Sequence, residues 1–302
     1  MRLPAGNGAM AGPEPQGTVA APAPASASKK PGSLASRVVV GLFLAAIAIA
    51  DIWVGGSAFT LMIVAGVGIV FWEWGTMHQT PVAWRIAGLL VLVAVSVFAH
   101  LGQPLAALAV LGTAIALFAL LTVLARMPGK RWLSTGLAYA GLPAIALIWL
   151  RGQPDGFALV MWTMALVWAT DIFAYFVGRA IGGPKIWTAV SPNKTWAGLV
   201  GGMVAAGLFS ALFGLYRGWP QPFLMLVALG MALAVVAQAG DFFESWLKRR
   251  AGVKDSGRIL AGHGGMMDRV DGLVPVVCLV ALWVGMQPRV AYVAVSIPEM
   301  FA

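Results

Sequence analysis

Residues 222–240 read PFLMLVALGMALAVVAQAG, a run that contains no charged side chain. A helix of this length matches the ~30 Å hydrocarbon thickness of a bilayer. The run therefore predicts a transmembrane helix. Directly after it the chain changes character, and residues 240–250 read GDFFESWLKRR.

Similar apolar runs recur along the whole chain. The 302 residues are 60% hydrophobic and only 10% charged, whereas a soluble domain carries about 25% charged residues. A water-soluble fold could not hide so much apolar surface, so the sequence predicts an all-α integral membrane protein. About nine transmembrane helices are expected, at 37–54, 57–74, 86–101, 104–125, 132–150, 156–178, 195–216, 222–240 and 271–288.

The distribution of positive charge gives the expected orientation. Residues 1–34 are rich in Ala, Pro, Gly and Ser and predict a disordered cytoplasmic tail, followed by a polytopic membrane catalytic domain over 35–302. With the N-terminus inside, nine helices leave on the opposite side only three of the 20 Lys and Arg residues, namely Arg151, Arg217 and Arg289. Topology thus accounts for the net charge of +9, and nucleic acid is not an expected partner.

Acidic residues gather between the last two predicted spans. Five of the 11 Asp and Glu residues lie within 241–271. Asp241, Glu244, Ser245 and Lys248 share one helical face by their spacing. An ordinary polar loop would explain the neighbouring cations, but not acids at both membrane boundaries, where charge is costly and usually faces an ion, a cavity or a partner.

Mixed carboxylates and cations suit the handling of phosphate. Carboxylate oxygens hold Mg²⁺, which binds polyphosphate oxygens, and Lys and Arg neutralise the remaining phosphate charge. Backbone amides at Gly264–Gly265 are expected to approach an anion closely. A second cluster, Asp171 with Tyr175 and Arg179, ends the sixth span, and the segment 191–195 adds Lys194 and two hydroxyls just before the next helix, a natural phosphate position.

These residues together resemble the signature of the phosphatidate cytidylyltransferases, or CDP-diacylglycerol synthases. The matching positions within 245–271 are Ser245, Lys248, Arg249, Lys254, Asp255, His263, Gly264, Gly265, Asp268, Arg269 and Asp271. Two upstream blocks, 171–179 and 191–195, and the short Phe71-Trp-Glu-Trp74 segment are also similar. Two positions depart from the family pattern. Ala261 stands where the family commonly has Pro or Gly, and Ala197 stands where it commonly has Glu.

The resemblance implies an enzyme of phospholipid biosynthesis that transfers the cytidylyl group of CTP to phosphatidic acid, giving CDP-diacylglycerol and pyrophosphate. It implies the bacterial inner membrane as location, with the active site on the cytoplasmic side. Expected partners are CTP, phosphatidic acid and membrane lipids, and a homodimer is compatible with the sequence. The alternatives are a membrane transferase for another lipid phosphate, and an ion or anion transporter.

The chemistry of these residue types and the resemblance to the family together give the candidate roles. The candidate catalytic residues are Asp241, Lys248, Asp268, Arg269 and Asp271. The candidate phosphate-binding residues are Ser191, Lys194, Thr195, Ser245, Arg249, Lys254, His263, Gly264 and Gly265. The candidate ligands of Mg²⁺, with K⁺ or a second divalent ion as the candidate second metal, are Asp171, Asp241, Glu244, Asp268 and Asp271.

Overall fold

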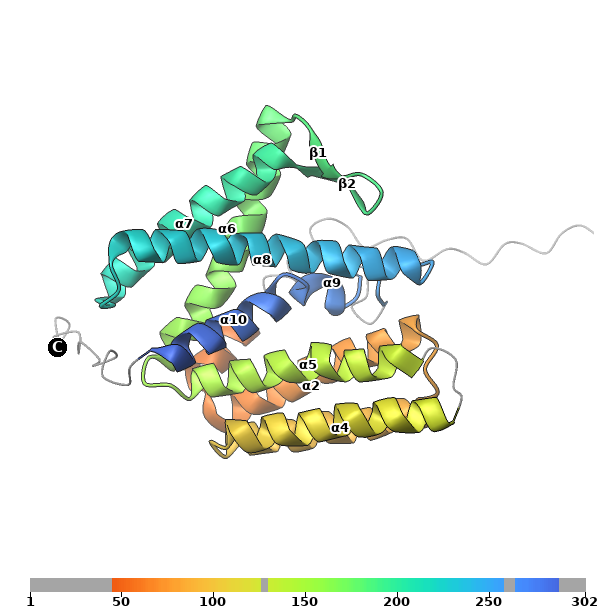
Figure 1. Ribbon diagram of the computed structural model, residues 1–302. Helices are drawn as coiled ribbons and strands as arrows, with labels where there is room; N and C mark the ends of the chain where they lie inside the picture. The colour runs from red at the N-terminus through yellow and green to blue at the C-terminus, as the bar shows by residue number, and fades with distance from the viewer. Residues whose placement is uncertain (1–44, 126–129, 258–263, 288–302) are drawn as a thin grey trace, which may run out of the picture. The chain divides into compact units, whose positions relative to one another are not determined.

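The structure is a computed structural model that describes residues 45–125, 130–257 and 264–287. The predicted tail over 1–34 lies outside this range. The elements are the helix Ala45–Val54, α2 (Gly56–Met77), α3 (Val82–His100), α4 (Pro104–Leu124), α5 (Lys130–Arg151), α6 (Gly156–Ile181), β1 (Lys185–Trp187), β2 (Ser191–Thr195), α7 (Trp196–Arg217), α8 (Phe223–Arg250), α9 (Met267–Val270) and α10 (Leu273–Met286) (Figure 1).

The predicted membrane helices are present. In the described part of the chain, 7 helices are long and apolar enough to cross a membrane, and Ala45–Val54 and Leu273–Met286 are shorter apolar helices within the two remaining predicted spans. The all-α membrane fold is therefore confirmed. The cytoplasmic orientation of the N-terminus stays a prediction.

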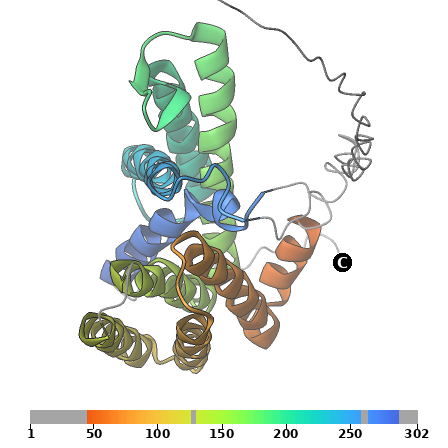
Figure 2. The same ribbon diagram turned by 90° about the vertical axis from the view of Figure 1, so that its right-hand side faces the viewer.

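The helices form two packed groups. In one, α2, α3, α4 and α5 pack against one another, and in the other α7 packs against both α6 and α8. Helix α10 contacts α5, α6 and α8, so it joins the groups (Figure 1). Figure 2 shows the helix Ala45–Val54, in red-orange, beside α2.

Glycines let the second group pack closely. A Cβ added at Gly202 of α7 would lie 2.8 Å from the Thr170 carbonyl oxygen of α6, and one at Gly230 of α8 would lie 2.4 Å from the Ala206 carbonyl oxygen of α7. Because the lipid tails are as apolar as the helix faces, such close backbone contact is a main source of helix association in membranes. These contacts hold the three helices that carry the site.

Arg151 and Arg217, two of the three cations expected on the non-cytoplasmic side, have structural partners. The Arg151 guanidinium donates to the backbone oxygens of Ile52 and Trp53, at 2.6 Å and 3.0 Å, and so satisfies carbonyls at the end of the helix Ala45–Val54. Arg217 pairs with Asp155 at 2.5 Å. Both residues therefore bind the ends of neighbouring helices, and they can do so on the non-cytoplasmic side of the membrane.

One feature was not predicted. Residues 185–195, which lie almost entirely between the predicted spans 156–178 and 195–216, form an antiparallel hairpin in which Lys185 pairs with Thr195 and Trp187 with Ser191. Helix α8 continues without a break past the predicted span 222–240 to Arg250, as the common helical face of Asp241 and Lys248 requires. Its 28 residues span about 42 Å, longer than the hydrocarbon core of about 30 Å, so its charged last turns extend beyond the apolar layer.

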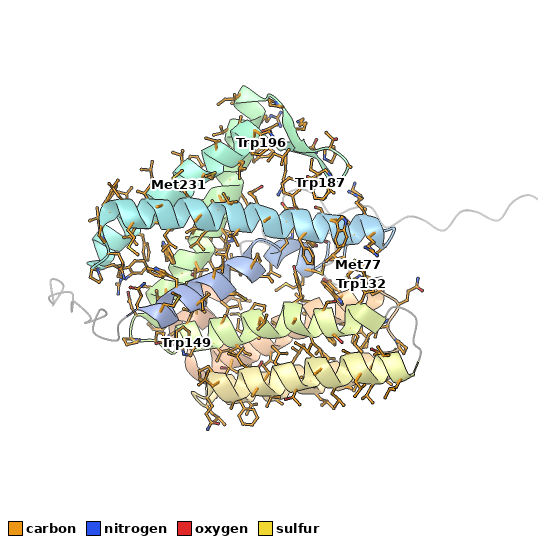
Figure 3. The ribbon with its side chains drawn as sticks, in the orientation of Figure 1. Met77, Trp132, Trp149, Trp187, Trp196 and Met231 are labelled. Atoms are coloured by element: carbon orange, nitrogen blue, oxygen red, sulfur yellow. The ribbon has the colours of Figure 1, made fainter. Side chains whose placement is uncertain are left out.

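A buried apolar cluster connects these last turns to the first helical group. It contains Trp74 and Met77 of α2, Leu247 of α8 and Met267 of α9, with Trp132 of α5 packed against it. Figure 3 labels Met77 and Trp132, which lie close together at the charged end of α8. The cluster fixes α9, and with it the signature segment, against α2 and α8.

Candidate active site

Lys248 connects two carboxylates in the last turns of α8. Its Nζ lies 2.9 Å from Glu244 Oε2, one turn earlier, and 2.6 Å from Asp268 Oδ1 of α9. The side chains of Lys248 and Glu244 are 13% and 1% exposed. The predicted helical face is therefore confirmed, and its charges are paired internally rather than solvated.

Asp268 also organises the chain between α8 and α9, described over 251–257 and 264–266 and called the signature loop below. Its Oδ2 accepts hydrogen bonds from the backbone N–H of Ser256 at 3.2 Å and of Gly265 at 2.9 Å. Burial alone would raise the pKa of Asp268, but hydrogen bonds with Glu244, Lys248 and the Gly265 amide, together with the Lys248 charge, lower it below its usual range. The carboxylate is therefore ionised in any ordinary buffer.

Glu73 holds the same loop from the opposite side. This residue of α2 is 2% exposed, and its carboxylate accepts from the backbone N–H of Met266 at 3.0 Å and of Met267 at 2.9 Å. The Ser256 hydroxyl donates to it at 3.3 Å. A buried acid near the end of a membrane helix thus serves as acceptor for loop amides that would otherwise have no partner.

Two separate physical constraints favour glycine at positions 264 and 265. Gly264 has φ +82°, a left-handed conformation that favours glycine. A Cβ at Gly265 would lie 1.9 Å from the Ser256 hydroxyl oxygen and 2.7 Å from Glu73 Oε2. The Gly265 amide, expected to approach a bound anion, donates to the Asp268 carboxylate, so the pair makes room for the side chains of Glu73 and Asp268, which hold the loop.

A second charged grouping surrounds Lys194 on β2. Lys194 pairs with Asp241 of α8, and its Nζ lies 4.7 Å from the centre of the Phe242 ring. The Ser245 hydroxyl donates to Asp241 at 3.3 Å. Gln238, one turn before Asp241, donates to Asp171 of α6 at 3.2 Å. The two upstream blocks therefore meet helix α8 here.

This second grouping faces an open cavity of about 680 Å³. Its lining comes from α6, the hairpin, the start of α7, and α8, and includes Asp171, Arg179, Lys194 and Asp241. Thr195, also in the lining, caps α7 by accepting the Gly198 amide at 3.1 Å. A cavity of this size with convergent charges of both signs is suited to a polar ligand.

The remaining candidate residues are spread around these groupings. Ser191 is half-buried on β2, and Arg249, Lys254 and Arg269 are exposed. Asp271 follows α9 and lies within electrostatic range of Asp241 and Asp171. His263 and Ala261 lie outside the described residues. Ala197 is half-buried at the first turn of α7.

The metal-ligand candidates divide between the two groupings. Glu244 and Asp268 are with Lys248, whereas Asp171, Asp241 and Asp271 are near Lys194. Over 45–125, 130–257 and 264–287, no three His, Cys, Asp or Glu side chains are arranged to hold a metal ion by themselves. Magnesium often needs only one or two protein carboxylates, because phosphates and water complete its shell. Asp171 and Asp241, both lining the cavity, fit that role.

Glu73 and Gln238 were not predicted as site residues. In the sequence, Glu73 belongs to the Phe71–Trp74 segment and Gln238 to an apolar run. Each is a polar residue inside a predicted span. That signal, which marks functional positions in membrane proteins, could have found both.

Comparison with known proteins places the chain in a family. The model described as "Cytidylyltransferase family" matches residues 35–286. Phosphatidate cytidylyltransferase from Brucella abortus biovar 1 (strain 9-941) is 41% identical over 259 residues, which cover 83% of this chain and 93% of that protein. The enzyme of the same name from Pseudomonas aeruginosa is 38% identical over 263 residues, 83% of this chain and 97% of that protein.

The similarity extends to a relative of lower identity. Phosphatidate cytidylyltransferase from Bacillus subtilis (strain 168) is 32% identical over 250 residues, 79% of this chain and 93% of that protein. The family match spans both charged groupings and every described helix from α2 to α10. This chain therefore belongs to the cytidylyltransferase family.

Proposed function

We propose that the chain is a phosphatidate cytidylyltransferase, which converts CTP and phosphatidic acid to CDP-diacylglycerol and pyrophosphate. The observation that carries the proposal is the meeting of Lys194, Asp241 and Asp171 at a polar cavity, next to a loop fixed by Lys248 and Asp268. One substrate is a soluble polyphosphate and the other is held in the bilayer. A charged cavity at the end of apolar helices suits both.

The proposed reaction is an in-line displacement at phosphorus. A phosphate oxygen of phosphatidic acid forms a bond to the α-phosphorus of CTP, and the bond from that phosphorus to the oxygen bridging to the β-phosphate breaks. Pyrophosphate leaves with that oxygen. No strong general base is required, because the attacking phosphate is already ionised. Catalysis of this kind depends on positioning and charge stabilisation.

In this proposal the two groupings have different tasks. Lys194 neutralises triphosphate charge in the cavity, assisted by Ser191 and by exposed cations such as Arg249, Lys254 and Arg269. Lys248, held between Glu244 and Asp268, keeps the signature loop in place and presents its charge near the reacting phosphates. Asp241 and Asp171, with Asp271 nearby, would hold Mg²⁺, which when bound neutralises charge on the leaving pyrophosphate.

The proposed location follows from the charges. The last turn of α8 carries Lys248, Arg249 and Arg250, and cationic segments remain on the cytoplasmic side. We therefore assign the charged end of α8, and the site with it, to the cytoplasmic face of the bacterial inner membrane, where CTP is available. The homodimer stays a proposal without a specific contact to support it.

A single assay tests the function. Purified protein in detergent micelles is given CTP, phosphatidic acid and Mg²⁺, and both CDP-diacylglycerol and pyrophosphate are measured. We expect stoichiometric formation of the two products, and at least a ~100-fold loss in the Asp268→Asn variant, with an unchanged elution profile in detergent. Folded parent protein that makes neither product would refute the proposal, and ion flux through the same protein in liposomes would instead favour a transporter.

A further inference from the structure

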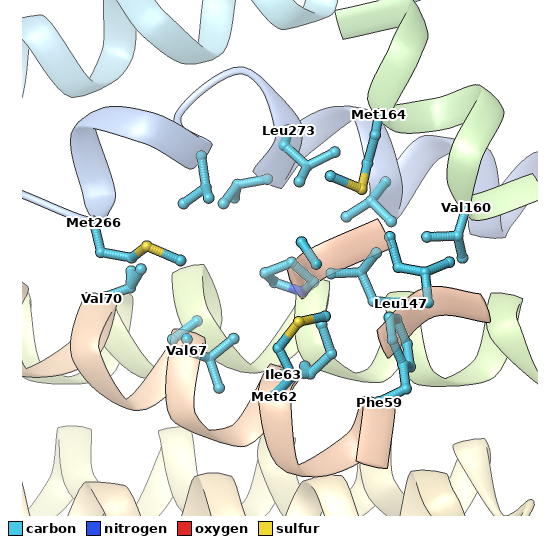
Figure 4. Close-up of a pocket in the computed structure, with 18 of the residues that line it drawn as sticks. Phe59, Met62, Ile63, Val67, Val70, Leu147, Val160, Met164, Met266 and Leu273 are labelled. Carbon is cyan, nitrogen blue, oxygen red and sulfur yellow. The ribbon is translucent and has the colours of Figure 1, made fainter. Parts of the chain in front are cut away.

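A second cavity, apolar in character, lies on the other side of the signature loop. It has a volume of about 170 Å³ and is lined by residues of the helix Ala45–Val54, α2, α5, α6, α9 and α10 and by Met266. Figure 4 shows side chains from several of these elements converging on it, including Phe59, Val67, Met164 and Leu273. The cavity is distinct from the polar one, which has none of these residues in its lining.

The apolar cavity adjoins the charged site directly. Met266 and Val270 line it, and the Met266 amide is one of the two held by Glu73. Val270 lies between Asp268 and Asp271 in the chain. The same short segment therefore presents acids to the polar site and apolar side chains to this cavity.

Tyr139 of α5 marks the boundary between the two. Its ring stacks on Trp74 with a centroid distance of 5.0 Å, and it belongs to the cavity lining. Its hydroxyl is buried and has no hydrogen-bond partner within the described ranges. Its ring also lies 6.2 Å, between centroids, from that of Phe243 on α8, which stands between Asp241 and Glu244 in the chain. A buried tyrosine hydroxyl normally has a partner, so this one is available as a donor to a ligand at the boundary.

The size and chemistry of the cavity point to a hydrocarbon chain. An apolar cavity of about 150 Å³ stays dry and binds benzene, so this one suits a stretch of roughly six chain carbons. Moving a lipid chain here from the bilayer gains little hydrophobic energy, because both surroundings are apolar. The benefit is orientation, since a chain held at this place keeps its polar head beside Tyr139 and the acids.

We propose that this cavity binds a stretch of one acyl chain of the phosphatidic acid substrate and that Tyr139 donates a hydrogen bond to the lipid's polar head. The inference rests on the proposed function, because the lipid phosphate must react at the adjoining site. Continuity of the cavity with the signature loop through Met266 and Val270 selects the substrate lipid over an unrelated bilayer lipid.

Two glycines of α2 provide a matched test. Gly66 lines the cavity, and a Cβ there would lie 3.6 Å from Met266 Cε, an ordinary contact. A Cβ at Gly68 would also lie 3.6 Å from its neighbour, Leu89 Cδ2, but Gly68 is not in the lining. Gly66→Leu therefore fills the cavity, and Gly68→Leu makes the same change on the same helix elsewhere.

The expected result is a selective effect on the lipid. Gly66→Leu should lower kcat/KM for dioctanoyl and dioleoyl phosphatidic acid roughly tenfold, the effect of an added group in an apolar pocket. The fall in kcat/KM for dibutanoyl phosphatidic acid should be smaller. The KM for CTP should not change, and Gly68→Leu should match the parent throughout. Gly66→Leu protein that keeps the parent's kcat/KM for phosphatidic acid at every chain length overturns the proposal.

Photo-crosslinking of the parent protein gives a second measurement that needs no variant. Phosphatidic acid with a diazirine in one acyl chain should label residues of this cavity, and unlabelled phosphatidic acid should compete better than phosphatidylcholine. Equal competition by the two lipids would indicate a general lipid site and overturn the proposal. Selective labelling without CDP-diacylglycerol formation would leave the cavity assignment standing while the proposed function fails.

Discussion

Lys248 Nζ lies 2.6 Å from Asp268 Oδ1 although 20 residues separate them in the chain. The contact ties the end of α8 to α9 and pairs a buried cation with two carboxylates, since Glu244 is also within 2.9 Å. Removal of one partner from a buried ionic group leaves the other charges uncompensated. The stability and the activity of the site should therefore depend together on this lysine.

The Lys248→Met variant tests this dependence. It leaves the Asp268 carboxylate, 16% exposed, without its cation, which should cost about 3–5 kcal/mol of stability and at least ~100-fold in activity. Thermal unfolding in detergent and the rate of CDP-diacylglycerol formation are the measurements. Lys248→Arg, which keeps the charge, should retain more of both. A Lys248→Met protein as stable as the parent would show that the triad contributes nothing to the fold.

Glu73→Gln tests the acceptor of the loop amides. The substitution keeps the shape but places an NH₂ group beside the N–H groups of Met266 and Met267 and the Ser256 hydroxyl. Two donors then face each other, and we expect the activity to fall by roughly 10²-fold as the loop shifts. Thr76→Ala, an exposed position three residues further along α2, is the control and should have parent activity. Parent activity in Glu73→Gln would contradict the role of this carboxylate.

The Lys194–Asp241 pair can be tested with a double-mutant cycle. Lys194→Gln and Asp241→Asn each remove one charge from the cavity, and each should reduce kcat/KM for CTP by at least ~10-fold. Because the two residues contact each other, the double variant should lose less than the product of the single effects. Strictly multiplicative losses would mean that the two side chains act independently on the substrate.

Metal dependence is the fourth prediction. Chelation with EDTA should abolish product formation, and added Mg²⁺ should restore it. Asp241→Asn should raise the Mg²⁺ concentration for half-maximal activity by ~10-fold or more. Asp155→Asn is the matched control, because Asp155 pairs with Arg217 outside the cavity, and it should leave the Mg²⁺ requirement unchanged. Full activity in the presence of EDTA would remove the metal from the proposal.

Much of the fold could be predicted because one physical rule dominates it. A run of apolar residues as long as a bilayer is thick reports a helix directly, and the ends of α4 and α6 lie within three residues of the predicted ones. The hairpin at 185–195 could not be predicted in this way. Its strands are short, and within them only Thr195 is buried, so no apolar pattern predicts them.

The site could be predicted only in part. The spacing of Asp241, Glu244, Ser245 and Lys248 gives their common helical face, and the structure confirms it. Spacing does not report pairing between distant segments, so the partnership of Lys248 with Asp268 and that of Lys194 with Asp241 were not expected. The division of the acids into two groupings depends on how α6, α8 and α9 pack, and the role of Glu73 depends on how α2 packs against the loop.

The contact between Glu73 and the signature loop spans 194 residues of chain. A fragment that begins at α6 would contain both upstream blocks and the complete signature, yet the amides of Met266 and Met267 would have no acceptor. The signature alone is therefore not a transferable unit. The signature grafted onto another membrane scaffold should be active only where a helix equivalent to α2 supplies the acid. Likewise, a protein made from a gene split after α5 should be active only when the fragment that carries α2 is also present.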